Sequence, residues 1–229
     1  MSERTRIVVV GATGLIGQAV LDAADGLKGV SILAIARREP SRRYASHVEV
    51  AVADPARWSE ALTDFRPDAL ICSLGTTWRK AGRDEAAFRA VDHGLVVEVA
   101  GAAKAHGATN AVVVSSVGAN LASESFYLRV KAEMERDMAR LGFARLGVLR
   151  PGLLRGERGG DRRLKERAAI ALSPLTDRLL PSSLSRFRSI AAEDVARAAL
   201  FSALADELGV AIHHNDGIQR LARSFEADR

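Results

Sequence analysis

The sequence has very little cysteine and no long hydrophobic run. Cys72 is the only cysteine among 229 residues, so no disulfide can form within the chain and nothing indicates an oxidising compartment. No apolar stretch reaches the roughly eighteen residues that a membrane-spanning helix needs. Residues 1–6 lead into a strand pattern without the apolar segment of a signal peptide. We therefore expect a cytosolic protein with no membrane span.

Aromatic residues are also scarce, at 5% of the chain, and this bears on how its basic charge is interpreted. Lys and Arg number 33 against 28 Asp and Glu, a balance that is compatible with nucleic-acid binding. The basic residues are scattered among acidic ones, and no aromatic residues alternate with them as in proteins that stack single-stranded bases. We therefore predict that nucleic acid is not a partner and that the charge serves solvation and an anionic cofactor.

Apolar segments alternate with helical patterns, which is typical of parallel strands joined by crossover helices. Strands are expected at Ile7–Val10, Ser31–Ala36, Val48–Val52, Ala69–Cys72, Ala111–Val114, Leu146–Leu149 and Gly209–His213. Helices are expected at Gly14–Ala24, Asp84–His106, Ser123–Leu141, Arg162–Leu172 and Ala192–Ala205. The predicted fold class is α/β, with a Rossmann-like, doubly wound parallel sheet. We expect one domain over residues 1–229, whose C-terminal part, from about residue 152, forms a small extension over the substrate cleft.

A glycine-rich turn follows the first predicted strand. Its GxxGxxG pattern covers Gly11-Ala12-Thr13-Gly14-Leu15-Ile16-Gly17. Between a strand and a helix, such glycines permit a tight turn and close approach of the backbone to a pyrophosphate at the helix N-terminus. The position in a βαβ unit favours a dinucleotide site over a plain glycine-rich turn. All seven residues are therefore candidate cofactor contacts.

The end of the second predicted strand bears on which nicotinamide cofactor binds. A carboxylate about twenty residues past the glycines hydrogen-bonds the ribose of NAD, but here Arg37 and Arg38 occupy this region. A guanidinium group matches a 2′-phosphate, so the sequence favours NADP(H) while NAD(H) stays open. The alternative is that both arginines only solvate the strand end.

Two further segments follow predicted strands on the cofactor side. Asp54 could bind the adenine amino group or cap a helix that begins at Pro55. Leu74-Gly75-Thr76 follows the fourth strand, where a parallel sheet presents its carboxyl edge to a ligand. Cys72, on that strand, is expected to be a small core side chain.

The second half of the chain contains a set of hydroxyl and ammonium groups. Tyr127 and Lys131 are four residues apart on a predicted helix, so both project from one face. Ser115 and Ser116 follow the fifth strand. A cation beside a tyrosine favours its ionised form and so brings it closer to proton transfer at working pH. We interpret these residues as a catalytic set, whereas YxxxK alone is common on helices.

The order of GATGLIG, LGTT, SSVGA, YLRVK and RPG resembles an atypical short-chain dehydrogenase/reductase over residues 6 to about 155. SSVGA, YLRVKAEMER and LRPGLLRGER are similar to the Tat-interacting oxidoreductase-like family and its bacterial relatives. The resemblance implies that Tyr127 exchanges the carbonyl proton and that Lys131 binds the nicotinamide ribose and lowers the tyrosine pKa. It implies that Ser115 or Ser116, with the second favoured, orients the substrate. It also places one segment beside the nicotinamide carboxamide: Pro151-Gly152-Leu153-Leu154.

Three functional hypotheses follow. The first is an NADP(H)-dependent oxidoreductase for a small-molecule carbonyl or alcohol; the second is a non-catalytic NADP(H)-binding regulator; the third is a nucleotide-sugar epimerase or dehydratase, for which the C-terminal portion is short. A homodimer or a protein partner stays open. A metal site is not expected, because His213 and His214 are adjacent and no third ligand is suitably spaced. Trp78 could wall the nicotinamide side, and four arginines are weaker candidates for substrate contact: Arg155, Arg158, Arg186 and Arg188.

Overall fold

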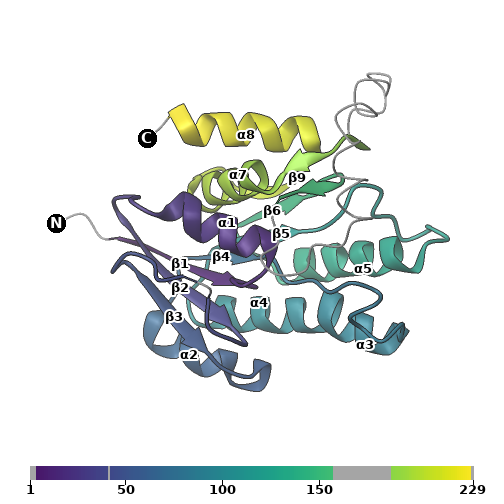
Figure 1. Cartoon of the computed structure of the whole chain (residues 1–229), viewed down its shortest axis with the longest axis horizontal. Coiled ribbons are helices and arrows are strands. Elements are labelled where there is room, and N and C mark those ends of the chain that lie inside the picture. Colours follow the sequence, from purple (N-terminus) through teal and green to yellow (C-terminus); the bar gives the residue numbers. More distant parts are fainter. Residues whose placement is uncertain (1–3, 41, 157–186, 228–229) are drawn as a thin grey trace.

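The computed structural model describes residues 4–40, 42–156 and 187–227. Seven parallel strands form a sheet in the order β3-β2-β1-β4-β5-β6-β9 (Figure 1). Their bounds are Thr5–Val10 (β1), Val30–Ala36 (β2), Val48–Val52 (β3), Ala69–Cys72 (β4), Asn110–Val114 (β5), Arg145–Leu149 (β6) and Gly209–His213 (β9). This architecture confirms the predicted α/β class with a Rossmann-like parallel sheet.

Helices cover both faces of the sheet, as Figure 1 shows. One layer holds α1 (Leu15–Ala24), α7 (Ala192–Leu204) and α8 (Asn215–Ala227), and the other holds α2 (Trp58–Phe65), α4 (Leu95–Ala105) and α5 (Phe126–Arg140). In β1, Ile7 and Val9 belong to the core on the first side, while Val8 and Val10 belong to the core on the second. Burial on both faces explains why the central strands are continuous apolar runs instead of alternating ones.

The sheet reverses its strand order between β1 and β4, and this point positions the site. β1 pairs with β2 on one side and with β4 on the other, all in parallel. The connections that leave β1 and β4 therefore diverge and open a crevice at the carboxyl edge, where doubly wound sheets bind ligands.

The helix expected over Asp84–His106 is divided into three parts. An α-helical turn, α3 (Glu85–Arg89), leads into a π-helical turn over Ala90–Gly94, and α4 continues from there. A π-helical turn adds one residue to a helical turn and is frequent at functional sites.

Four elements were not predicted from the sequence: α8, β7, β8 and a 3₁₀ turn. α8 is amphipathic and buries Ile218, Ala222 and Phe225, a spacing that the sequence does carry. A second, two-stranded sheet pairs β7 (Leu154–Arg155) with β8 (Ile190–Ala191). A 3₁₀ turn over Pro55–Arg57 precedes α2.

Some expectations concern residues beyond the described ranges. The helix predicted over Arg162–Leu172 and two of the candidate arginines, Arg158 and Arg186, lie outside the described residues. Across the three described ranges, no helix has both the length and the apolar character needed to cross a bilayer.

Candidate active site

A cavity of about 1040 Å³ lies at the carboxyl edge of the sheet, beside the crevice between β1 and β4. It brings together the glycine turn, the segment after β4, the end of β5 and the beginning of α5. Most of the residues predicted from sequence line it: Thr13, Gly14, Leu15, Ile16, Arg38, Leu74, Gly75, Thr76, Ser115, Tyr127, Lys131 and Leu154. The cofactor half and the catalytic half of the predicted site therefore share one cavity.

The three glycines of the turn have different roles. Gly11 has φ +84°, and a Cβ there would lie 2.9 Å from the carbonyl carbon of Ser73. A Cβ on Gly17 would lie 2.2 Å from the carbonyl oxygen of Gly11. These two glycines, with Ala12, allow close backbone packing and do not line the cavity. Gly14 alone of the three faces it.

The beginning of α1 fits an anionic cofactor. Gly14 is the N-cap residue and provides no side-chain hydrogen bond to the helix, and the first turn contains no acidic residue. The amides at this end thus remain available to a phosphate group, which the positive end of the helix dipole also attracts. A phosphate can approach closely because Gly14 has no side chain.

The candidate residues beside β2 and β3 separate into those that line the cavity and those that do not. Arg37 and Arg38 are both exposed, but only Arg38 lines the cavity. Asp54 is exposed and lies outside the lining. Asp54 is the N-cap residue of a 3₁₀ turn that begins at Pro55, as the alternative predicted, and its carbonyl accepts from the Arg57 N–H at 2.9 Å, but its side chain makes no capping hydrogen bond. Cys72 is fully buried, as expected, and burial raises the pKa of its thiol to about 11.

A buried ion pair lies at the base of the cavity. Lys131 Nζ is 2.9 Å from Asp92 Oδ1, and the two side chains are 5% and 1% exposed. The second carboxylate oxygen, Asp92 Oδ2, accepts a hydrogen bond from the Thr76 backbone N–H at 2.7 Å. Burial by itself lowers the pKa of Lys131, but the Asp92 carboxylate, with smaller contributions from Tyr127 and Cys72, outweighs burial, so that this pKa lies above its usual value. Lys131 is therefore a cation held in one place.

Asp92 was not among the site residues predicted from the sequence. The residue lies in the π-helical turn, and Phe88, Val96 and Val99 on the same helical segment are buried as well. The spacing of these three residues marks the apolar face of a helix, and Asp92 lies on the same face. An acidic residue on an apolar face could therefore have been recognised in the sequence as a candidate site residue. A carboxylate is rarely buried without a partner, and here the partner is the predicted catalytic lysine.

Tyr127 and Ser115 complete the cluster. Tyr127 is 40% exposed, lines the cavity and contacts the ring of Phe88 at a centroid distance of 5.8 Å. Ser115 is 5% exposed, and its Oγ has no hydrogen-bond partner among the described residues. Ser116, which sequence analysis favoured, lies beyond the strand end; its hydroxyl donates to the Val117 carbonyl at 3.3 Å, and it does not line the cavity. The geometry thus favours Ser115 over Ser116.

The segment predicted to pass beside the nicotinamide is held mainly by protein contacts. The Gly152 N–H donates to Asn215 Oδ1 at 2.8 Å, and Asn215 Nδ2 donates to the Arg188 carbonyl. A Cβ on Gly152 would lie 2.2 Å from that carbonyl oxygen. Pro151 and Gly152 do not line the cavity, whereas Leu154 does. Of the residues predicted to contact the cofactor in this segment, only Leu154 therefore lines the cavity, and Gly152 serves close packing.

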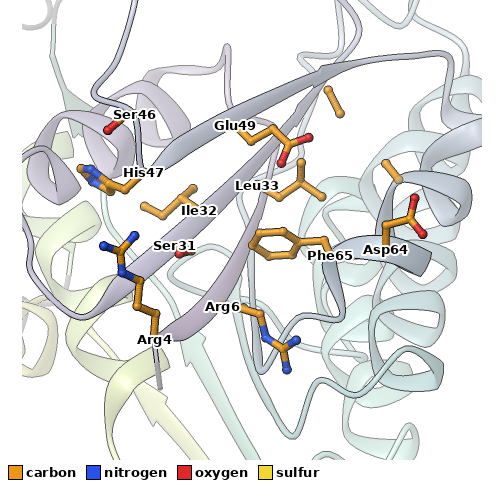
Figure 2. A pocket seen from close by; sticks show the side chains of 12 residues that line it. Arg4, Arg6, Ser31, Ile32, Leu33, Ser46, His47, Glu49, Asp64 and Phe65 are labelled. Carbon is orange, nitrogen blue, oxygen red and sulfur yellow. The ribbon is translucent and has the colours of Figure 1, made fainter. Parts of the chain in front are cut away.

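A second cavity of about 520 Å³ lies near the amino ends of β1, β2 and β3. Figure 2 shows Arg4, Arg6 and His47 around it together with Glu49 and Asp64. Side chains of both charge signs line it, and none of the predicted site residues does. We therefore treat it as separate from the candidate active site.

Comparisons with known proteins agree with the fold. Residues 7–211 match the family described as the NAD dependent epimerase/dehydratase family. The chain is 31% identical over 230 residues to "Protein FMP52, mitochondrial" of Meyerozyma guilliermondii, which covers 97% of both chains. It is 38% identical over 154 residues to the protein of the same name in Saccharomyces cerevisiae, which covers 66% of each. The cytosolic location expected from the sequence is contradicted by these relatives, which are named mitochondrial proteins.

Solved structures show a similar fold at low sequence identity. The Bordetella bronchiseptica enzyme WbmG in complex with NAD has a TM-score of 0.68 and 16% identity, covering 99% of this chain and 78% of that one. UDP-glucose 4-epimerase of Thermotoga maritima with UDP-glucose has a TM-score of 0.68 and 14% identity, covering 97% and 82%. The finer resemblance to the Tat-interacting oxidoreductase-like family stays a prediction.

Proposed function

Because the chain belongs to the NAD dependent epimerase/dehydratase family, we propose that it is an oxidoreductase that moves hydride between a nicotinamide dinucleotide and a small carbonyl or alcohol. One observation carries the proposal: the uncapped, glycine-lined N-terminus of α1 and the Tyr127–Lys131–Ser115 cluster line the same cavity. The bound cofactor would supply or accept the hydride. The protein residues would bind, orient and exchange the proton.

The side chains divide the proton chemistry among them. In the direction of reduction, Tyr127 donates its hydroxyl proton to the carbonyl oxygen, while Ser115 Oγ donates a hydrogen bond that orients the same oxygen. Ser115 suits this role because its buried hydroxyl has no protein partner within the described ranges. The Lys131 ammonium lies one helical turn from Tyr127 and stabilises its ionised form after the transfer.

Asp92 acts through Lys131 and is a positioning residue. Its two carboxylate oxygens bind the ammonium and the backbone that follows β4, so it connects α5 to the segment that contains Gly75. A Cβ on Gly75 would lie 3.4 Å from Asp92 Oδ1 and 4.0 Å from Lys131 Nζ. The glycine thus leaves the pair accessible from the cavity.

Asp92→Asn is expected to destabilise the protein by about 3–5 kcal/mol, because removal of one partner leaves a buried charge uncompensated. The asparagine keeps an oxygen that can accept the hydrogen bond from the Thr76 N–H. The loss of stability therefore reports the removed charge and not a lost hydrogen bond. The double variant Asp92→Asn with Lys131→Met contains neither charge and should recover most of the loss. Urea unfolding of the three proteins at neutral pH measures both quantities. Equal stability of Asp92→Asn and wild type would show that the ion pair has no such role.

We propose NADP(H) as the preferred cofactor, with Arg38 as the residue that binds the 2′-phosphate. Arg38 lines the cavity, whereas Arg37 does not, and a guanidinium matches a phosphate dianion in shape and charge. The neighbouring Glu39 is exposed and outside the lining, which supports the proposal because no carboxylate at this strand end lines the cavity.

Arg38→Ala should weaken NADPH binding about ten-fold or more, since a hydrogen bond to a charged group contributes about 1.5–3 kcal/mol. NADH affinity should stay close to wild type. Arg37→Ala is the matched control, because it removes the same charge from the adjacent position outside the cavity. Fluorescence titrations of the three proteins with both reduced cofactors give the affinities. A wild type that binds NADH more tightly than NADPH would refute the assignment.

The test of the activity itself is oxidation of the reduced cofactor, followed by its absorbance, across a panel of small carbonyl compounds. Tight cofactor binding without turnover of any compound would favour the non-catalytic regulator.

A second candidate, an epimerase or dehydratase of nucleotide sugars, is supported by the family to which the chain belongs. The chain covers only 78–82% of the two solved structures named above, which leaves less chain for a nucleotide-sugar lobe. Conversion of UDP-glucose to its epimer by the protein with NAD would favour this candidate over the reductase.

A further inference from the structure

Four aromatic rings gather in the wall of the candidate active-site cavity. Trp78 lies in the segment after β4, Phe88 in α3, and Phe126 and Tyr127 at the beginning of α5. The Trp78 ring is 5.9 Å from Phe126 and 6.3 Å from Phe88, between centroids, and Phe88 is 5.9 Å from Phe126. All four residues line the cavity. In a chain with only 5% aromatic residues, this is a marked concentration.

The two tryptophans of the chain differ in a way that indicates the role of Trp78. Trp58 is 2% exposed, and its indole N–H donates to the Ala53 carbonyl at 3.0 Å, as expected of a core residue. Trp78 is 43% exposed although Phe88 and Phe126 contact it. A large ring that is supported by its neighbours yet open to the cavity is a preformed binding surface.

Charged side chains of both signs also line the cavity: Arg38, Lys80, Glu85, Asp92 and Lys131. Two of them, Lys131 and Asp92, neutralise each other in the buried ion pair. Arg89 contacts the Phe126 ring and is paired with Glu133, so its charge is compensated. The aromatic rings themselves therefore provide apolar and π contacts.

We infer that the substrate is a carbonyl or alcohol compound that bears a flat aromatic or conjugated group, which packs on Trp78 while the reacting oxygen reaches Tyr127. This inference rests on the proposed function and names the substrate class of the same site. Offset or edge-on contact with the supported indole favours a planar group over a puckered one of equal size. Tyr127 lies in the same aromatic cluster, through its contact with Phe88, so the wall and the proton donor are adjacent.

Kinetics with two matched ketones test the inference. 2-Acetylnaphthalene and its saturated counterpart, 2-acetyldecalin, present the same methyl ketone on a flat and on a puckered ring system. Wild type is expected to prefer the flat ketone in kcat/KM. Trp78→Ala should raise KM for 2-acetylnaphthalene about ten-fold, the size of one lost aromatic contact with its buried area, and should raise KM for 2-acetyldecalin by clearly less, because that ketone loses only buried area. Trp78→Phe keeps a ring and should restore most of the preference.

A binding measurement separates this inference from the proposed function. In a Trp58→Phe background Trp78 is the only tryptophan, so quenching of its fluorescence by 2-acetylnaphthalene reports binding at the wall without turnover. Saturable quenching by 2-acetylnaphthalene that an excess of 2-acetyldecalin does not displace supports the inference even if no ketone is reduced, an outcome that would count against the reductase alone. Reduction of both ketones with equal kcat/KM, or an unchanged KM in Trp78→Ala, would overturn the inference and leave the reductase intact.

Discussion

Replacement of Tyr127 by phenylalanine is expected to lower turnover of an accepted carbonyl by about 10²–10⁴-fold, the contribution of general acid–base catalysis. The change deletes one oxygen and leaves the ring, so the contact with Phe88 persists. Cofactor affinity should remain close to wild type, because the phosphate contacts are proposed at the N-terminus of α1. Steady-state kinetics and a cofactor titration on the same protein sample measure the two quantities.

The chain offers a matched control for this variant. Tyr44 is the only other tyrosine; it lies outside the cavity lining, and the Arg42 guanidinium packs over its ring. Tyr44→Phe removes the same atom from a remote position and should leave kcat unaltered. Lys131→Met should instead impair both turnover and cofactor binding, because the ammonium is proposed to hold the ribose as well. Wild-type turnover in Tyr127→Phe would rule out the catalytic assignment.

Gly14→Val is expected to reduce cofactor affinity by about 100-fold or more while the protein stays folded. The backbone of Gly14 has φ −78° and ψ 170°, which valine tolerates. The nearest atom to an added Cβ is the Gly11 carbonyl oxygen at 3.1 Å, and Gly14 lines the cavity, so we expect the rest of the side chain to enter it. It would occupy the space proposed for the pyrophosphate. Calorimetric titration with NADPH measures the loss.

Gly17→Ala distinguishes a blocked site from an unfolded one. Its single added carbon would lie 2.2 Å from the Gly11 carbonyl oxygen and 2.7 Å from Ala12 Cα, so the turn cannot keep its shape. We expect this smaller substitution to lower the melting temperature markedly, whereas Gly14→Val should not. If Gly14→Val binds NADPH normally, the glycine turn is not the phosphate site.

The predictable parts of the fold are those that short sequence patterns determine, namely apolar runs and the glycine-rich turn. The strands are short β-branched or apolar runs with burial on both sides, and the glycine turn stands directly between β1 and α1, so their order implied a parallel sheet. α8 also carried a helical spacing at Ile218, Ala222 and Phe225 and was overlooked.

Other features depend on the direction in which a single side chain points, and the pattern of apolar and polar residues in the sequence does not determine this direction. Ser115 and Ser116 differ by one step at the end of β5, and only one faces the cavity; the same holds for Arg37 and Arg38 after β2. The π-helical turn that directs Asp92 inward inserts one residue into a helix whose apolar period otherwise appears continuous.

The packing of α1 against α7 joins two helices that lie far apart in the sequence. The helix whose N-terminus faces the cavity buries Ile16, Val20 and Leu21, and α7 (Ala192–Leu204) packs against it. Without α7, α1 would expose part of its apolar face to water. The turn that precedes α1 therefore depends on a contact of high sequence separation, so the proposed cofactor site is stable only once the chain from β1 to α7 has folded together.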